Sequence, residues 1–292
     1  MMRPYEVSPR LPVPPHIPAP PYVGFTPSPK SMSDEEVLFD PSKVTIWTEP
    51  DIAKMRQSCR LARQILNYAG SLVAPGVTTD EIDRLVHQKI IESGAYPSPL
   101  LYYGFPKSIC TSINEVVAHG IPDSRPLRSG DVLSIDVTVY LNGFHGDCCD
   151  TFVVGKNADS VPVVKVAREC MERGIAVCRP NAEFSMIGEA IESHAHAHQC
   201  MVVPELTGHG IGTHFHTHPY IAHVRNRSPG RMQAGMIFTI EPIVVEGLED
   251  IDTWEDEWTL STKDHSRGAQ FENTVLITPQ GVEVLTRDPD SD

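Results

Sequence analysis

The chain has 292 residues, of which 40% are hydrophobic and 21% charged, so it can bury a large core in one domain or two. Its net charge is −14 without any lysine or arginine run, which argues against a nucleic-acid patch or an acidic membrane surface as partner. No apolar run approaches the roughly 18–20 residues that a membrane-spanning helix needs. The seven cysteines form no C-x-x-C pair, which is typical of buried thiols in a reduced intracellular compartment.

Residues 1–45 are interpreted as a proline-rich N-terminal extension rather than a domain. The first thirty residues hold ten of the 26 prolines. Proline favours extended polyproline II backbone over helix or sheet. We expect this segment to lie over the folded domain as a tail or to act as a linker, with the folded part extending over 46–292.

Hydrophobic spacing and turn residues predict the elements of the folded part. The first two helices start at sequences that resemble capping boxes, Thr48 with Asp51 and Thr78 with Glu81. Helices are expected over 48–70, 78–94, 161–178 and 185–199. A strand pair, or a strand and turn, is expected over 109–117, a strand over 131–140, and a strand-rich stretch over 202–290 with loops at 214–228 and 248–257.

The strand over 131–140 carries a carboxylate on its polar face. Strand side chains alternate between faces, so the hydrophobic residues at 133, 135, 137 and 139 share one face and Asp136 lies on the other. Asp147 follows eleven residues later and is expected to return beside Asp136 across a turn. Two carboxylates held together cannot both stay ionised cheaply unless a cation binds them. This stretch therefore predicts a metal site.

The same pattern occurs a second time in the chain. The segment 130–136 consists of a glycine, a strand and an acid, and it is matched by 235–241. The segment 143–147 is matched in the same way by 268–272. A duplication of this kind brings four carboxylates together, which requires cations to neutralise them. The four acids are Asp136, Asp147, Glu241 and Glu272.

One histidine is a candidate nitrogen ligand for this site. His209 lies between two glycines, which allow close approach to its imidazole. An imidazole among carboxylates shifts the preferred metal towards Mn, Fe, Co or Zn. His194 and His198 are four residues apart on the predicted helix 185–199, where an exposed polar face is favoured over a metal site. Taken alone, His119 is expected to be a packed or surface histidine.

At this point the motifs resemble those of type I methionine aminopeptidases, in order and spacing, over roughly 48–288. The matching segments are 114–122 (NEVVAHGIP), 131–139 (DVLSIDVTV), 143–147 (GFHGD), 208–212 (GHGIG), 238–242 (FTIEP) and 269–272 (AQFE). The proline-rich lead-in is most similar to the organellar branch, mitochondrial type 1D. The resemblance implies an α/β (α+β) pita-bread fold, a curved antiparallel sheet covered by helices. It also implies one catalytic domain over 46–292 with pseudo-symmetric halves at about 75–155 and 160–288.

The resemblance further implies two divalent metal ions (Co, Mn, Fe or Zn) and the residues that hold them. The implied metal ligands are Asp136, Asp147, His209, Glu241 and Glu272, with Asp147 and Glu272 as bridges. The implied methionine pocket is lined by Tyr102, Phe105, Cys110, Phe215 and Trp258. His119 and His216 match histidines that bind substrate without holding metal. His216 is expected to hydrogen-bond the substrate carbonyl, His119 to stabilise the tetrahedral centre, and Glu241 to carry the proton.

The implied activity is removal of the N-terminal methionine from nascent or newly made proteins whose second residue is small. The expected partners are the N-terminal methionine of polypeptides and ribosome-associated nascent chains, with no nucleic acid and no membrane. A monomer is expected. The resemblance implies a mitochondrial location, with a plastid or the cytoplasm as alternatives.

Two other functions remain open at the level of the sequence. One is a proline-directed enzyme of the aminopeptidase P or prolidase type, although the segment 1–45 is short for the large N-terminal domain usual there. The other is a non-catalytic pita-bread binding protein, although all five ligand positions are filled. The chain also departs from the family pattern at three places beside the expected site, Ala118, Cys148–Cys149 and Asn273.

Overall fold

The computed structural model describes residues 2–24 and 43–288; residue 1 and residues 25–42 of the predicted extension lie outside this part, as do 289–292. The helices are α1 Glu49–Ser71, α2 Thr79–Glu92, α3 Pro162–Ala176 and α4 Ser185–Ala197, with 3-10 turns η4 Tyr102–Gly104 and η5 Ala158–Ser160. The strands are β1 Tyr96–Pro97, β2 Cys110–Ile113, β3 Val116–Ala118, β4 Val132–Leu141, β5 Phe144–Val153, β6 Met201–Val202, β7 Thr207–Gly210, β8 Thr217–Ala222, β9 Ile237–Ile240, β10 Ile243–Val245, β11 Ile251–Thr253, β12 Leu260–Thr262, β13 Gly268–Gln270, β14 Glu272–Thr278 and β15 Gly281–Val284. The four predicted helices are confirmed.

The helix starts follow the sequence signals in one case and not in the other. Thr78 accepts from the backbone N–H of Glu81, and Glu81 accepts in return, so the capping box of α2 is confirmed. The box predicted for α1 is wrong. The Thr48 hydroxyl donates to the Asp51 carboxylate at 2.5 Å and accepts no backbone N–H. An aspartate is too short to complete the box that a glutamate closes at Thr78.

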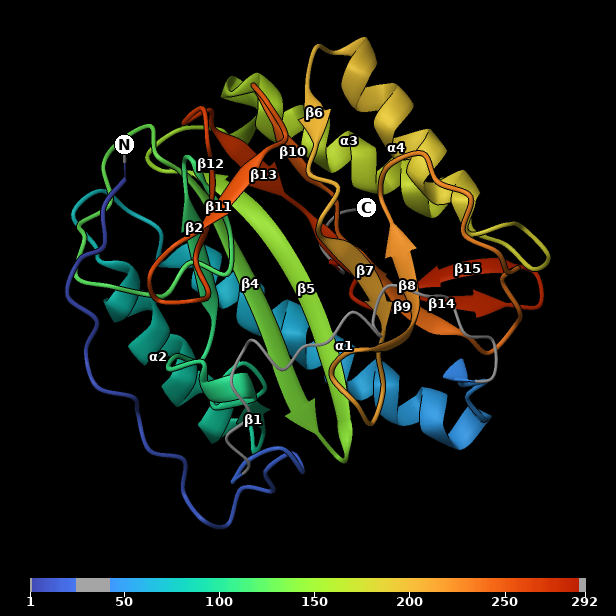
Figure 1. Ribbon diagram of the computed structural model, residues 1–292. Helices are drawn as coiled ribbons and strands as arrows, with labels where there is room; N and C mark the ends of the chain where they lie inside the picture. Colours follow the sequence, from blue (N-terminus) through green and yellow to red (C-terminus); the bar gives the residue numbers. More distant parts are fainter. Residues whose placement is uncertain (1, 25–42, 289–292) are drawn as a thin grey trace.

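A curved sheet of antiparallel strand pairs forms the centre of the molecule (Figure 1). Its strand order is β1-β4-β5-β14-β9-β7-β8, with β2 also pairing with β4 and β15 with β14. Two small sheets, β13-β10-β6 and β11-β12-β3, contain the remaining strands, and β3 in the second of them comes from the first half of the chain. The loops predicted at 214–228 and 248–257 are wrong in part, because β8 and β11 lie inside them. Pro219 within β8 and the brevity of β11 hid these outer strands from the sequence pattern.

The repeated sequence pattern appears as two matching strand pairs at the middle of the sheet. Strand β4 pairs with β5, β9 pairs with β14, and β5 pairs with β14, so the order β4-β5-β14-β9 is symmetric about its centre. Gly130 and Gly235 precede β4 and β9 with φ of +91° and +94°, a backbone conformation that glycine adopts without strain. The two segments therefore share their local geometry as well as their sequence.

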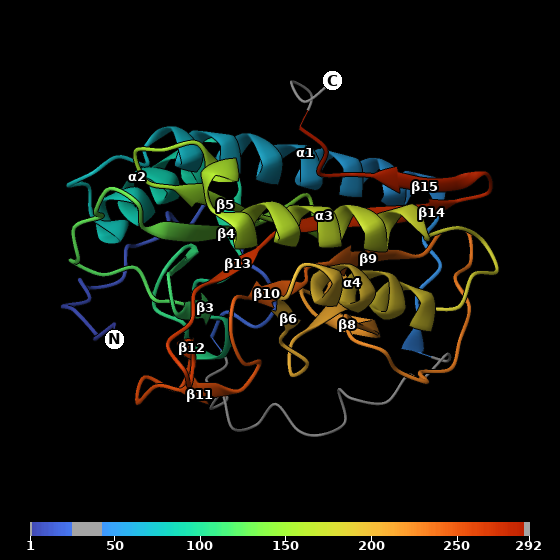
Figure 2. The ribbon, with the colours of Figure 1, turned by 90° about the horizontal axis from the view of Figure 1, so that it is seen from above.

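The helices cover one face of the sheet, and polar side chains lie on the other face. Helix α1 packs on β4 and β5, and in Figure 1 it runs behind both strands. Helix α3 packs against β9, β14 and α4, and α4 also lies against β8; Figure 2 shows this arrangement from above. At Gly146 in β5 a Cβ atom would lie 2.4 Å from the Ser58 carbonyl carbon, so glycine permits the close approach of α1. None of the helices in the described ranges is long and apolar enough to cross a membrane.

The N-terminal segment 2–24 packs along the domain surface, past α2 and towards β1 (Figure 1). The carbonyl oxygen of Pro12 lies 3.1 Å from His87 Nε2 on α2. Ile17 is buried in a cluster with Tyr96 and Leu100. The Tyr22 hydroxyl donates to the Ser98 carbonyl oxygen at 2.5 Å. This segment is therefore part of the packed structure that surrounds the cavity described next.

Candidate active site

The side chains that the sequence predicts for metal and substrate all line one cavity of about 90 Å³. It lies on the face of the sheet opposite α1. Asp136 comes from β4, Asp147 from β5, His209 from β7, Glu272 from the first position of β14, and Glu241 from the residue that follows β9. Within the sheet, Asp136 on β4 and Glu272 on β14 each pair with Cys149 on β5, the strand between them. The three residues therefore lie in one row across the sheet.

His209 supplies a nitrogen donor on one side of the carboxylates. Its Nε2 lies 3.4 Å from Glu241 Oε1 and 3.8 Å from Asp147 Oδ2. Its Nδ1 lies 3.1 Å from the Gly210 carbonyl oxygen, to which it donates. Because Nδ1 carries the hydrogen, Nε2 presents its lone pair to the carboxylates. Histidines that bind metal through one ring nitrogen typically donate a hydrogen bond from the other nitrogen in this way.

Burial and mutual repulsion disfavour ionisation of the four carboxyl groups when no cation neutralises them. Burial raises the pKa of Asp136 to about 6 and that of Glu241 to about 8. Burial and the charge of Asp136 raise the pKa of Asp147 well above its usual range. Burial and the charge of Asp147 do the same for Glu272. A divalent cation in their midst would reverse this cost.

Two buried oxygens test whether these residues fit a metal. Asp136 Oδ1 and Glu272 Oε1 are inaccessible and have no hydrogen-bond partner in the structure. An unpartnered carboxylate oxygen in a protein interior is costly unless it coordinates an ion. Ligand atoms of Asp147, His209 and Glu272 lie within 4.8 Å of one another. The donor set of oxygens and one nitrogen therefore fits a divalent transition metal.

Two threonines that hold the carboxylates escaped prediction. Thr138 Oγ1 donates to Asp147 Oδ1 at 2.6 Å, and Thr239 Oγ1 donates to Glu241 Oε1 at 2.7 Å. Each orients a carboxylate and satisfies one of its oxygens. The signal was present in the alternation of the strands, because Thr138 shares a face with Asp136 and Thr239 with Glu241. Pro99 also lines the cavity, and no sequence pattern marks it.

Aromatic side chains enclose the rest of the cavity. Tyr102 packs on Phe215 with ring centroids 4.8 Å apart, and its hydroxyl lies 2.9 Å from His216 Nδ1. Phe105 meets Trp258 edge to face at 5.2 Å. These residues come from η4 and from loops distant in sequence. Together they build an apolar pocket beside the carboxylates, of the kind that buries an unbranched apolar side chain.

Burial disfavours the charged forms of three ionisable groups in this pocket, His119, His216 and Cys110. Burial lowers the pKa of His119 to about 4. Burial, together with neighbouring histidines, lowers the pKa of His216 well below its usual value. Burial and the nearby carboxylates raise the pKa of the Cys110 thiol, so it is not a thiolate nucleophile. The two imidazoles act as hydrogen-bonding groups rather than as cations.

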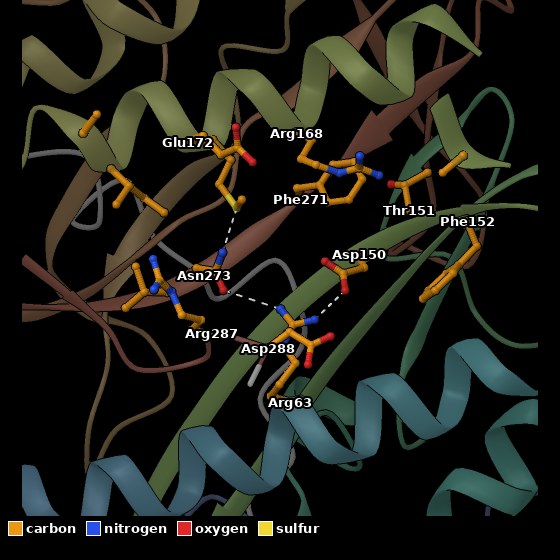
Figure 3. Close-up of a pocket in the computed structure, with 15 residues that line it drawn as sticks. Arg63, Asp150, Thr151, Phe152, Arg168, Glu172, Phe271, Asn273, Arg287 and Asp288 are labelled. Atoms are coloured by element: carbon orange, nitrogen blue, oxygen red, sulfur yellow. Dashed lines mark hydrogen bonds and ion pairs between the residues drawn. The ribbon is translucent and has the colours of Figure 1, made fainter. Parts of the chain in front are cut away.

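A larger cavity of about 680 Å³ lies behind the sheet, between α1 and α3 (Figure 3). Asn273, one of the departures from the family pattern, faces this cavity. Its Oδ1 accepts from Thr286 at 2.8 Å and from Arg63 at 3.5 Å. Because neighbouring strand residues point to opposite faces, Asn273 does not line the carboxylate-lined cavity to which Glu272 belongs. Cys148 lies on the same rear face, in the hydrophobic cluster under α1.

Comparison with known proteins identifies the family. The model of metallopeptidase family M24 matches residues 53–279. The chain is 56% identical over 237 residues to methionine aminopeptidase 1B, chloroplastic, of Arabidopsis thaliana, which covers 81% of this chain and 64% of that protein. It is 49% identical over 288 residues to methionine aminopeptidase 1D, chloroplastic/mitochondrial, of the same plant, covering 98% and 79%.

A solved structure agrees with these relatives. The crystal structure of methionine aminopeptidase from Rickettsia prowazekii superimposes with a TM-score of 0.81 at 43% identity, over 84% of this chain and all of that one. The expected pita-bread fold is confirmed by this likeness. Fold and sequence agree: the chain belongs to the organellar branch of the type I methionine aminopeptidases, within metallopeptidase family M24.

Proposed function

We propose that the protein removes the N-terminal methionine from newly made polypeptides whose second residue is small, as a two-metal aminopeptidase. The observation that carries this proposal is the pair of unpartnered buried oxygens, Asp136 Oδ1 and Glu272 Oε1, on residues that line the same cavity as His209. Asp136, Asp147, His209, Glu241 and Glu272 would hold two divalent ions, from among Mn, Fe, Co and Zn. When bound, such ions supply Lewis acidity and acidify a water molecule.

The pocket residues bind the methionine side chain. Tyr102, Phe105, Cys110, Phe215 and Trp258 offer aromatic faces and a neutral thiol, and a thioether makes favourable contacts with aromatic rings. These residues line the same cavity of about 90 Å³ as the carboxylates. The chemistry of this lining therefore suits a methionine side chain held next to the carboxylates.

His216 orients the substrate carbonyl. To donate to a carbonyl oxygen, its Nε2 must carry the hydrogen, and Nδ1 must then accept from the Tyr102 hydroxyl that lies 2.9 Å away. Tyr102 thus fixes the tautomer of His216 and also forms part of the pocket wall. His119 packs edge to face against Trp258 at 6.1 Å and donates to the developing tetrahedral centre.

Glu241 carries the proton between water and the leaving amine. Its side chain is 16% exposed, compared with 5% for Asp147, so it is the more accessible of these two carboxylates. Thr239 and Gln270 hold its two oxygens, at 2.7 and 3.3 Å. A carboxylate that is held in place and reachable from the cavity meets the geometric need of general acid–base catalysis.

The cellular setting follows the relatives. Two of them are named chloroplastic or chloroplastic/mitochondrial and two others mitochondrial, and we propose an organellar location for this protein, the mitochondrion first. There it would act as a monomer on nascent chains at the organellar ribosome. Localisation of the tagged full-length protein and sedimentation of the purified one test these two points.

Substrate discrimination tests the proposed activity. The metal-loaded enzyme is expected to release free methionine from Met-Ala-Ser and to leave Xaa-Pro peptides intact. Preferential cleavage of Xaa-Pro peptides would instead identify a proline-directed enzyme. Absence of turnover with every divalent metal tried would identify a binding protein on the same fold.

A further inference from the structure

The last turn of α4 carries histidines that the active site does not use. The sequence favours an exposed polar face for His194 and His198, and the structure corrects this for His194. Its side chain is only 8% exposed, because it packs against Glu169 on α3. His196 and His198 are exposed. The turn therefore joins two helices through one buried imidazole.

Three ligand groups converge at this junction. His194 Nε2 lies 2.8 Å from Glu169 Oε2, and the rings of His194 and His198 lie 4.3 Å apart between centroids. One ligand atom from each of the three residues lies within 4.8 Å of the other two. Among the residues that the structure describes, the candidate active site provides the only other group of this kind.

The hydrogen bonds hold both imidazoles in place, and the one at His198 leaves a ring nitrogen available to a metal. His198 Nδ1 lies 2.9 Å from the His194 carbonyl oxygen, which can only accept, so Nδ1 carries the hydrogen and Nε2 keeps its lone pair. Ligating histidines are commonly oriented in this way. Without an ion, His194 Nε2–H donates to Glu169. A bound ion would take the place of that hydrogen and shift the tautomer of His194.

The donor set selects the metal. Two imidazoles and one carboxylate suit Zn²⁺ with a water molecule as fourth ligand, whereas Mg²⁺ and Ca²⁺ prefer oxygen ligands throughout. Lys165 Nζ lies 3.9 Å from Glu169 Oε1 and opposes a cation, but its side chain is 61% exposed and is free to turn into solvent. The net charge of −14 favours cation binding over the molecule as a whole.

We propose that Glu169, His194 and His198 form a zinc site separate from the active site, which fastens the end of α4 to α3. The active-site ligands come from strands and the residue after β9, whereas these three come from α3, α4 and the residue that follows α4. The site would hold one ion beyond those needed for turnover. It is independent of the proposed function, because none of its residues lines the substrate cavity.

Zinc counting tests the proposal on the full chain loaded with its active-site metal. Wild-type protein and the variants His198→Ala and Glu169→Gln are dialysed in the same zinc buffer, and zinc per chain is measured by mass spectrometry. Wild type is expected to bind one more zinc ion than either variant. The matched control His196→Ala, which removes an exposed histidine from the same turn, is expected to keep the wild-type count.

Two outcomes would contradict the assignment. Equal zinc counts in wild type and His198→Ala would show that no site exists here. Loss in His198→Ala without weaker binding in Glu169→Gln would reduce the site to a helical histidine pair. Release of methionine by His198→Ala at the wild-type rate shows that the variant is folded. A zinc-induced rise in Tm that is larger in wild type than in His198→Ala supplies a second readout.

Discussion

Hydroxyl groups hold the carboxylates in the centre of this site. Thr138 fixes Asp147, Thr239 fixes Glu241, and Thr239 Oγ1 also accepts from the backbone N–H of His209 at 2.9 Å. These contacts leave Asp136 Oδ1 and the Glu272 Oε1 atom without protein partners. The protein therefore satisfies part of the carboxylate set itself and leaves the remainder to an ion.

Replacing one of the unpartnered carboxylates separates metal binding from stability. We expect Asp136→Asn and Glu272→Gln to lower turnover of Met-Ala-Ser by at least about a hundredfold. Mutating a residue that only hydrogen-bonds a metal ligand already lowers metal affinity or activity by about 10–100-fold. The Tm of the metal-free variants should not fall below that of the metal-free wild type, because each removes one buried charge from a repelling group. Wild-type hydrolysis by either variant would show that the site is wrongly assigned.

His223 gives the molecule a defined sensitivity to acid. Its Nε2 accepts from the backbone N–H of Glu241 at 3.2 Å, and burial lowers its pKa to about 3. Between that value and the unfolded value of about 6.5, the unfolded chain binds one more proton, so stability falls as pH falls. From pH 7 to pH 5 this costs about 2 kcal/mol of unfolding free energy.

The variant His223→Gln isolates this contribution. Glutamine offers an acceptor for the same N–H and does not titrate. Urea unfolding at pH 7 and pH 5 should show a loss of stability that is about 2 kcal/mol smaller in the variant than in wild type. The same loss in both proteins would mean that His223 is not the group responsible.

Among the elements, the N-terminal segment 2–24 contributes to the pocket from outside. The Tyr22 ring packs edge to face on Tyr102 at 5.0 Å and lies 6.1 Å from the ring of His145. Tyr102 in turn contacts His216 and Phe215. A segment that composition alone marks as a tail or linker therefore supports a residue that lines the proposed substrate cavity.

Removing that ring should loosen the pocket. We expect Tyr22→Ala to lower kcat/KM for Met-Ala-Ser by about fivefold, because an aromatic pair contributes about 1 kcal/mol beyond its buried area. Tyr22→Phe keeps the ring contact and should stay near wild type. Tyr5→Ala changes an exposed tyrosine of the same segment and serves as the control. An unchanged kcat/KM in Tyr22→Ala would mean that Tyr102 needs no such support.

The elements also show which features a sequence can reveal. The strand β4, the helices and the paired acids follow from periodicities of two and 3.6 residues, which depend only on near neighbours. The packing of Tyr22 on Tyr102 joins residues 80 positions apart and leaves no local pattern. The burial of His194 likewise depends on where α3 lies. Such contacts depend on how distant segments pack together, and the residue pattern of one segment does not show this packing.

For the molecule as a whole, the duplicated strand pairs bring together a group of charges that disfavours folding. The order β4-β5-β14-β9-β7 places four carboxylates of raised pKa and His209 on one face of the sheet. Single motifs predicted each acid, but only the resemblance to the family predicted the pocket, because Tyr102, Phe215 and Trp258 come from unrelated loops. Metal binding is what makes this arrangement favourable.

The requirement for metal is tested most directly by titrating the metal-free enzyme with Mn²⁺ or Co²⁺. The readout is the release of methionine from Met-Ala-Ser. Turnover is expected to be at background without metal, to rise with each addition and to reach its plateau by about two equivalents per chain. The variant Glu272→Gln, titrated alongside, should stay at background throughout. Release of methionine by the metal-free protein at the metal-loaded rate would contradict the account.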